Sequence, residues 1–366
     1  MKKINSLDYN TLIWFIIRSC FTELTFTTLI YHIKQDSWIS IIIGSVLGLI
    51  PFSIYEILKH KYPDDNLITI NKKLYKKFGN IINMIILLGC LIASFCLFWI
   101  LIHFTNALFL AKTSPWIISI AMILPVGYAS TKNIHIIGKI SLILFYLNIV
   151  FNIIIMTGLT GNIDINGIKP ILENKITKIF SCSIFFIGFN IAKLFFLTAI
   201  SKKEIKNYSS KMNLITYIIS CINLLSIITT TICVFGIDLT ALYEYPAFQI
   251  LKRVNIIGAL DRIENILSLE AIFSNFILII IIMYYARKII SETFHTKQKT
   301  NKYIIIFICI FTIITSNTIF ITHEDGEKFF QTYLLYIIYF ICILIPFITL
   351  LKSLNNKEQN KLWEPK

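Results

Sequence analysis

The chain has 366 residues, of which 56% are hydrophobic and 15% are charged, and its mean hydropathy is +0.73. This composition excludes a soluble globular protein and is typical of a membrane protein with many spans. The formal net charge of +14 does not require a nucleic-acid partner, because lysines that flank membrane spans and face anionic lipid headgroups account for it.

Apolar segments long enough to cross a bilayer recur along the chain and are separated by short polar or basic connectors. We therefore predict an all-α polytopic membrane protein with about ten transmembrane helices. The first segment carries Arg18 and Glu23 and lacks a small-residue cleavage site, so we expect it to remain as a helix. The predicted spans are 11–33, 37–58, 81–109, 115–131, 138–158, 178–200, 212–236, 266–289, 303–321 and 330–350.

Lysine and arginine are distributed unevenly between alternating connectors, and this asymmetry predicts the orientation of the chain. The opposite side of the membrane receives few basic residues and holds acidic clusters such as residues 323–327. We expect both termini to be cytoplasmic, in a bacterial inner (cytoplasmic) membrane. Most of the 34 basic residues fall on this cytoplasmic side, in segments 2–3, 59–77, 132–139, 202–211, 287–302 and 352–366.

Two connectors are predicted to carry structure of their own. The first is amphipathic, with Leu67, Ile70, Leu74 and Phe78 on one face and lysines on the other, which predicts a short helix on the inner membrane surface; a solvated basic loop is the alternative. The second, residues 243–265, mixes apolar and charged residues too evenly to span a membrane.

We expect this second connector to form an outer helical hairpin that dips between the spans, with Gly258 as its turn. Arg262 and Glu264 would hold the hairpin as a lid rather than contact a ligand.

The sequence has none of the motifs of soluble enzymes: no GxGxxG, GxxxxGK[ST], HExxH or GxSxG pattern is present. All eight cysteines fall in apolar segments without a CxxC pair or a cluster with histidine, so they are predicted to be buried and to bind no metal. We expect neither an enzyme nor a cofactor.

Ionisable residues at membrane depth are the informative ones, because a charge there costs about 2.5–3.5 kcal/mol even on the lenient insertion scale. Arg18 and Glu23 lie within the first span, and Lys193 follows Gly188 and Asn190 in the sixth. Polar interruptions in the spans that open each half predict discontinuous helices 1 and 6 of a five-plus-five inverted repeat, as in transporters that bind substrate at the midplane. Gly188 supports a break in the sixth span, whereas the first has no Gly or Pro between residues 12 and 33.

We expect one transmembrane domain over residues 1–366. Its first repeat covers about 11–158, an outer connector covers 159–177, the second repeat covers about 178–321, and a cytoplasmic tail covers 351–366. Each boundary follows from the predicted spans and connectors.

The predicted ligand site lies at the two interruptions. Thr22 and Glu23 are expected to face the ligand, Gly188 and Asn190 to offer hydrogen bonds, and Phe185 to pack on the ligand's apolar part. Glu270 in the eighth span is expected to partner a buried cation, either Lys193 or Arg18. The alternative is that the ionisable residues pair with one another and only hold the bundle together.

Three passages resemble the B-subunit family of bacterial spore germinant receptors, the GerAB type, within the amino acid, polyamine and organocation transporter superfamily. They run from Lys34 to Ser40 with Gly44, Gly48 and Pro51, from Tyr62-Pro63 to Phe78-Gly79, and from Tyr245-Pro246-Ala247-Phe248 through residues 251–254 to Asp261-Arg262-Ile263-Glu264. The resemblance covers nearly the whole chain. It departs from the family where the first span lacks its usual glycine and where the sixth reads Gly188-Phe189-Asn190.

The resemblance implies ten helices in a five-plus-five inverted repeat and a germinant, commonly an amino acid, sugar or nucleoside, bound within the bundle. It also implies A and C partner subunits and the spore inner membrane. We therefore expect a nutrient-germinant receptor subunit that signals to its partners in spore germination. An amino acid permease coupled to sodium or protons, built on the same architecture, is the alternative, and a membrane anchor without a ligand is a third class.

Overall fold

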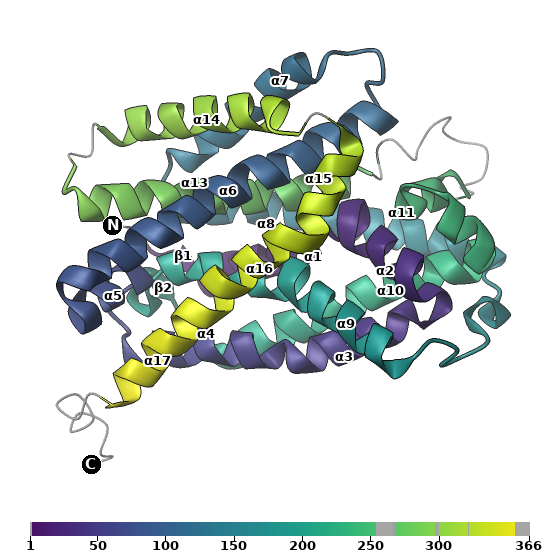
Figure 1. Ribbon diagram of the computed structural model, residues 1–366, viewed down its shortest axis with the longest axis horizontal. Coiled ribbons are helices and arrows are strands. Elements are labelled where there is room, and N and C mark those ends of the chain that lie inside the picture. The colour runs from purple at the N-terminus through teal and green to yellow at the C-terminus, as the bar shows by residue number, and fades with distance from the viewer. Residues whose placement is uncertain (1, 254–265, 267, 297–299, 321, 356–366) are drawn as a thin grey trace.

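The structure is a computed structural model that describes residues 2–253, 266, 268–296, 300–320 and 322–355. It is a bundle of helices that run mostly along one long axis (Figure 1). We call the end that holds β1 and the last turns of α17 the terminal end, and the opposite end, which holds α2 and α11, the distal end. The prediction of an all-α polytopic protein is confirmed.

The first half of the chain opens with a two-residue strand and then continues as helices. Its elements are β1 (Ile4–Asn5), α1 (Ser6–Arg18), a π-helical turn (Phe21–Thr25), α2 (Phe26–Ile33), a 3₁₀ turn (Lys34–Asp36), α3 (Ser37–Leu47), α4 (Leu49–Lys61), α5 (Leu67–Tyr75), α6 (Lys77–Leu108), α7 (Pro115–Ser130) and α8 (Ile134–Leu159).

The second half follows two short 3₁₀ turns, Thr160–Asn162 and Ile165–Ile168. Its elements are α9 (Ile176–Phe186), a π-helical turn (Ile187–Ile191), 3₁₀ segments (Ala192–Ala199 and Lys202–Glu204), β2 (Ile205–Lys206), α10 (Ser210–Leu242), α11 (Pro246–Gln249), a 3₁₀ turn (Ile250–Arg253), α13 (Leu269–Thr293), α14 (Asn301–Thr318), α15 (His323–Phe329), α16 (Leu335–Ile338), and α17 (Ile345–Asn355), with π-helical turns Phe330–Leu334 and Tyr339–Leu344 on either side of α16.

Eight helical stretches in the described part of the chain are long and apolar enough to cross a membrane. The first of them, Ser6–Lys61, contains both predicted spans 11–33 and 37–58, and the chain turns back between them at Lys34, whose φ is +48°. The predicted span 115–131 is a shorter apolar helix, α7. The exact count of ten spans stays a prediction.

Helices of the first half pack on helices of the second half in equivalent pairs. α3 packs on α9 as α10 packs on α1, and α7 packs on α13 as α14 packs on α6. β1, just before α1, pairs in parallel with β2, just after the sixth predicted span, so the start of the first span and the end of the sixth meet at the terminal end. This packing is what an inverted repeat requires, because the second half must begin at the opposite end of the bundle from the first.

The basic connectors lie together at the terminal end. One cavity of about 580 Å³ there is lined by basic residues from three segments: Lys2 and Lys3 before β1, Lys203 after the sixth span, and Arg287 of α13. The predicted grouping is therefore confirmed for the segments that line this cavity, while the side of the membrane that they face stays a prediction.

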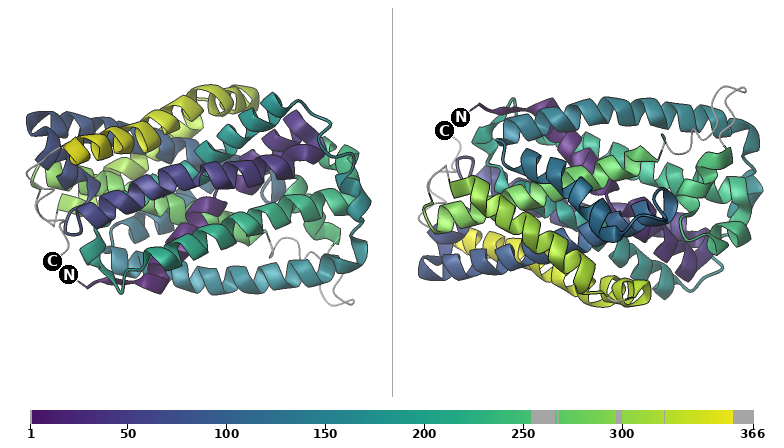
Figure 2. Two further views of the ribbon diagram at one scale, coloured as in Figure 1. Left: turned by 90° about the horizontal axis from the view of Figure 1, so that it is seen from below. Right: turned by 90° about the horizontal axis from the view of Figure 1, so that it is seen from above.

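The helix α8 is apolar on the outside and polar on the inside. Both views of Figure 2 show it along an edge of the bundle, and its buried positions include Gly138, Ser141 and Asn148, whereas Ile143, Leu147 and Ile153 are exposed. This is the reverse of a helix at a water-facing surface, and it is expected where the exterior solvent is lipid and polar groups face the interior.

The amphipathic helix after the second span is present as α5. Asn66 caps it, because its side chain accepts a hydrogen bond from the Thr69 backbone N–H at 3.0 Å, and Leu67, Ile70 and Leu74 are buried as predicted. The helix ends at Tyr75, however, so the prediction for Phe78 is wrong: it belongs to α6 and is 71% exposed. The reversed φ of Lys76, +50°, separates the two helices and rotates Phe78 away from the buried face.

Gly79 lies where α6 touches the backbone of α5. A Cβ at this position would stand 2.4 Å from the Asn71 carbonyl oxygen, which cannot move without shifting α5. We expect Gly79→Ala to lower the free energy of unfolding by about 1–3 kcal/mol, the usual cost of overpacking. Thermal unfolding of the purified protein measures this change, and Gly161→Ala, where a Cβ meets nothing within 4 Å, is the matched control that should leave stability unchanged.

Candidate functional site

The first span breaks near its centre. α1 ends at Arg18, Cys20 adopts a left-handed backbone conformation with φ +58°, and the chain resumes as the π-helical turn Phe21–Thr25. Asn275 of α13 holds the break from outside, because its Oδ1 accepts a hydrogen bond from the Cys20 backbone N–H at 3.0 Å. The predicted discontinuity of this span is confirmed, although no Gly or Pro marks it.

The sixth span breaks beside the first. α9 gives way to the π-helical turn Ile187–Ile191 and then to the 3₁₀ segment Ala192–Ala199. Asn190 donates its Nδ2 hydrogen to the Ile17 carbonyl at 2.8 Å, and Lys193 Nζ donates to the Ser19 carbonyl oxygen and hydroxyl, both at 2.7 Å. Carbonyls left free at the end of α1 are therefore bound by the sixth span, with an ammonium at the partially negative end of a helix.

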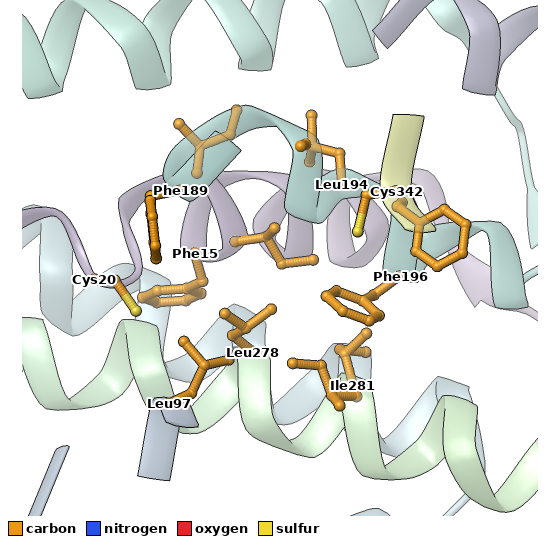
Figure 3. Packing of buried hydrophobic residues seen from close by; sticks show 14 of the residues in the cluster. Phe15, Cys20, Leu97, Phe189, Leu194, Phe196, Leu278, Ile281 and Cys342 are labelled. Atoms are coloured by element: carbon orange, nitrogen blue, oxygen red, sulfur yellow. The ribbon is translucent and has the colours of Figure 1, made fainter. Parts of the chain in front are cut away.

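The interior around the two breaks is packed with aromatic and aliphatic side chains. Figure 3 shows Phe15 of α1 and Phe189 of the sixth span near Leu97 and Leu278, which belong to α6 and α13. All four side chains are buried. On this side the breaks therefore adjoin an apolar core, where polar groups need partners within the protein.

A buried ion pair joins the first and eighth spans. Arg18 Nη2 lies 2.6 Å from Glu270 Oε1, and both residues are buried. Asn148 and Asn152 of α8 donate to the other carboxylate oxygen, Oε2, at 3.1 and 2.8 Å. The prediction that Glu270 partners a buried cation is confirmed, and the cation is Arg18.

The same network reaches a fourth span, α10. The other guanidinium nitrogen, Nη1, donates to Asn223 Oδ1, and Asn223 Nδ2 donates to Asn152 Oδ1 at 3.0 Å. Trp14 Nε1 donates to Asn148 Oδ1 at 3.0 Å, and the Arg18 guanidinium stands 5.5 Å from the centre of the Trp14 ring. Side chains of α1, α8, α10 and α13 thus form one connected polar cluster.

A small cavity, which we call the central cavity, opens on the distal side of this cluster. It leaves about 50 Å³ for the centres of water-sized molecules, enough for a few waters. Apolar residues such as Phe104, Met156 and Phe248 form most of its wall, and Phe248 belongs to α11, which covers it from the distal end. Its polar lining residues are Thr22, Asn152, Thr230, Thr231, Ser268 and Glu270.

Glu23, next to Thr22, faces a different cavity. Its Oε1 accepts a hydrogen bond from Asn275 Nδ2 at 2.7 Å, whereas Oε2 has no hydrogen-bond partner among the described residues. The cavity, of about 330 Å³, opens at the distal end, and we call it the distal vestibule. Its charged lining side chains are Glu23, Glu244, Glu324, Glu327 and Lys328.

The structure brings together only part of the predicted site. Thr22 and Glu270 both line the central cavity, and Glu23 lines the distal vestibule. Asn190 hydrogen-bonds the Ile17 carbonyl at the end of α1. Gly188 packs against the tenth predicted span instead, where a Cβ would stand 2.5 Å from Leu335 Cδ1. Phe185 lines a third cavity, between α2, α9 and residues 331–335, and its ring packs at a tilt against that of Phe189 with 4.6 Å between ring centres.

The sequence analysis missed the asparagines of the polar cluster. Asn148 and Asn152 stand four residues apart in an apolar span, and Asn223 interrupts another. Amides at membrane depth also need partners, and a spacing of four places two of them on one helix face. That spacing was the available signal.

The outer connector is described only in part. α11 and the 3₁₀ turn Ile250–Arg253 cover the central cavity, and the Glu244 carbonyl accepts a hydrogen bond from Thr27 Oγ1 at 3.0 Å. The predicted turn at Gly258 and the lid residues Arg262 and Glu264 lie outside the described residues.

Two broken helices lie beside a cavity, and the two halves of the chain pack on each other through equivalent pairs of helices. These features define an integral membrane protein of the transporter type. A family model described as "Spore germination protein" (spore permease) matches residues 7–323. The chain belongs to this family, as the sequence resemblance indicated.

Individual relatives agree with this assignment. The chain is 24% identical over 264 residues to spore germination protein KB of Bacillus subtilis (strain 168), a match that covers 68% of each protein. It is 21% identical over 268 residues to spore germination protein YndE of the same organism, covering 72% of this chain and 73% of the relative.

A solved structure shows the same fold. Mhp1, a nucleobase-cation-symport-1 family transporter in a closed conformation with bromovinylhydantoin bound, matches with a TM-score of 0.52 at 12% identity, covering 95% of this chain and 78% of Mhp1. The family is that of a spore germination permease, and the fold is that of a multi-span membrane transporter.

Proposed function

We propose that this protein is a nutrient-germinant receptor subunit that binds a small molecule, such as an amino acid, at the break of the first span. The central cavity is the observation that carries the proposal. It adjoins the break, it has a mostly apolar wall with a few polar groups, and a segment of the outer connector covers it. Thr22, Asn152 and Glu270 would contact the ligand directly.

Binding would act through a conformational equilibrium. A ligand shifts such an equilibrium only when it binds one state more tightly than the other. Closing α11 over an occupied cavity would supply that difference, because α11 contributes Ala247 and Phe248 to the cavity wall. The A and C subunits of a germinant receptor would read this change from within the bilayer of the spore inner membrane, with the terminal end of the bundle in the cytoplasm.

An amino acid permease coupled to sodium or protons is the second candidate, and the transporter fold is the observation that favours it. In transporters with discontinuous helices, carbonyls at the end of a half-helix coordinate the coupling cation. Here Lys193 and Asn190 already bind the Ser19 and Ile17 carbonyls. The chain's own ammonium at this position supports the receptor over a sodium-coupled permease.

A cavity-filling variant tests the proposal in cells. Ala271 lines the central cavity, so spores that carry Ala271→Phe at wild-type protein level should lose the nutrient response of this receptor. Ala241→Phe, at an exposed position of α10, is the matched control and should respond normally. A normal response of the Ala271→Phe spores, or concentrative uptake of an amino acid by reconstituted vesicles, would contradict the receptor reading.

A further inference from the structure

The distal vestibule has a strongly negative lining. Four carboxylates, those of Glu23, Glu244, Glu324 and Glu327, face it with one ammonium, that of Lys328. Lys328 stands 3.8 Å from Glu324, but both side chains are more than 70% exposed, so this pair is weak in water. Low-dielectric walls lined by one sign of charge concentrate ligands of the opposite sign.

Glu23 gives the vestibule a built binding group. The residue is only 8% exposed, yet it lines the vestibule, and its Oε2 has no hydrogen-bond partner in the described part of the chain. A buried carboxylate oxygen without a partner is costly. A cationic donor that enters the vestibule would remove this cost.

The two buried cationic side chains near the breaks, Arg18 and Lys193, bind groups other than Glu23. Arg18 is paired with Glu270, and Lys193 binds the carbonyl and hydroxyl of Ser19. Among the described residues, no ion pair joins either of them to Glu23. A cation that enters from outside can therefore pair with Glu23 without displacing either of them.

Aromatic rings in the vestibule suit an ammonium group. Tyr31 and Tyr245 both line it, and a protonated amine is attracted to the face of such rings. Burial, together with the nearby carboxylates of Glu244, Glu23 and Glu327, raises the pKa of the Tyr245 hydroxyl above its ordinary value. Tyr245 therefore stays neutral and can accept a hydrogen bond from an amine without adding charge.

The arrangement fits an organic cation better than a metal ion. Within the described residues, no three carboxylate, thiol or imidazole groups converge closely enough to hold a metal. The carboxylates are instead spread around a space of about 330 Å³, which falls in the range of small-molecule pockets. An extended molecule can meet several of them at once.

We propose that the distal vestibule selects ligands that carry a protonated amine in excess of any carboxylate, and that Glu23 binds this amine. Basic amino acids and diamines belong to this class, whereas sugars, nucleosides and neutral amino acids do not. This inference rests on the proposed function, because it names the chemical class of the ligand that reaches the break of the first span.

Isothermal titration calorimetry on the purified full-length protein tests the inference. The cationic probes are L-lysine, L-ornithine and 1,5-diaminopentane, and the others are L-norleucine, which resembles lysine without its side-chain amine, glucose and inosine. We expect at least one cationic probe to bind about tenfold or more tighter than L-norleucine, and Glu23→Gln to remove this preference, as expected for one charge-assisted hydrogen bond. Asp238→Asn removes an exposed carboxylate of α10 outside the vestibule and should leave the preference intact.

The outcomes separate this inference from the proposed function. If L-norleucine, glucose or inosine binds as tightly as the cationic probes, or if Glu23→Gln weakens all probes equally, the selection of amines is wrong. Binding of a neutral probe that Ala271→Phe abolishes would keep the proposed function while overturning the inference. Binding of no probe at all would count against both. The thermal unfolding midpoint of each variant shows whether it is folded.

Discussion

Replacing Arg18 with methionine is expected to lower the free energy of unfolding by about 3–5 kcal/mol, because removing one partner of a buried ion pair leaves the other charge uncompensated. Glu270 would keep the hydrogen bonds from Asn148 and Asn152 but lose its cation at 2.6 Å. Thermal or denaturant unfolding of the purified protein in detergent measures the loss.

Two controls decide whether the ion pair is responsible. Glu270→Gln in the Arg18→Met background removes the orphaned charge and should restore a large part of the stability. Lys203→Met breaks an ion pair with Asp64 in which both side chains are more than 65% exposed, and it should change stability little. Equal losses in the single and double variants would show that the packing of Arg18, and not its charge, matters.

Replacing Asn275 with leucine should cost about 2–4 kcal/mol of unfolding free energy, because two buried polar groups would each lose a partner worth about 1–3 kcal/mol. One is the Cys20 backbone N–H at the break, and the other is Glu23 Oε1. Leucine keeps the branched shape of the asparagine side chain but removes both of its hydrogen-bonding groups. The same unfolding measurement applies.

The matched control for this variant is Asn80→Leu, an exposed position of α6 that should be nearly neutral. Asn275→Leu should also weaken the binding of cationic probes, since Asn275 orients the Glu23 carboxylate. Unchanged stability together with unchanged binding would mean that Asn275 does not hold the break of the first span.

Charges at membrane depth made part of this structure predictable. Because a buried Glu270 needs a partner, its pairing with a buried cation, either Arg18 or Lys193, could be expected before the fold was known. Polar interruptions in the first and sixth spans indicated the breaks. Several of the basic connectors that were predicted to lie together also meet at the terminal end. Two predicted spans separate each of the basic connectors from the next, so the chain returns to the same end each time.

The orientation of side chains around each helix axis could not be predicted in the same way. A span that faces lipid on one side and the core on the other is apolar on both sides. The sequence of the sixth span therefore does not reveal that Gly188 faces Leu335 while Asn190 faces Ile17. The break after Arg18 is marked by polar residues but by no Gly or Pro, so its position along the span could not be predicted. It depends on partners far along the chain, Asn190, Lys193 and Asn275, that become neighbours only in the folded bundle.

The central claim is that a small molecule binds in the central cavity at the break of the first span. Thermal unfolding of the purified protein with and without a panel of amino acids, sugars and nucleosides, for wild type, Ala271→Phe and Ala241→Phe, tests it most directly. We predict that one class of compound raises the unfolding midpoint of the wild type and of Ala241→Phe but not that of Ala271→Phe. A shift that persists in Ala271→Phe, or no shift for any compound, would contradict the claim.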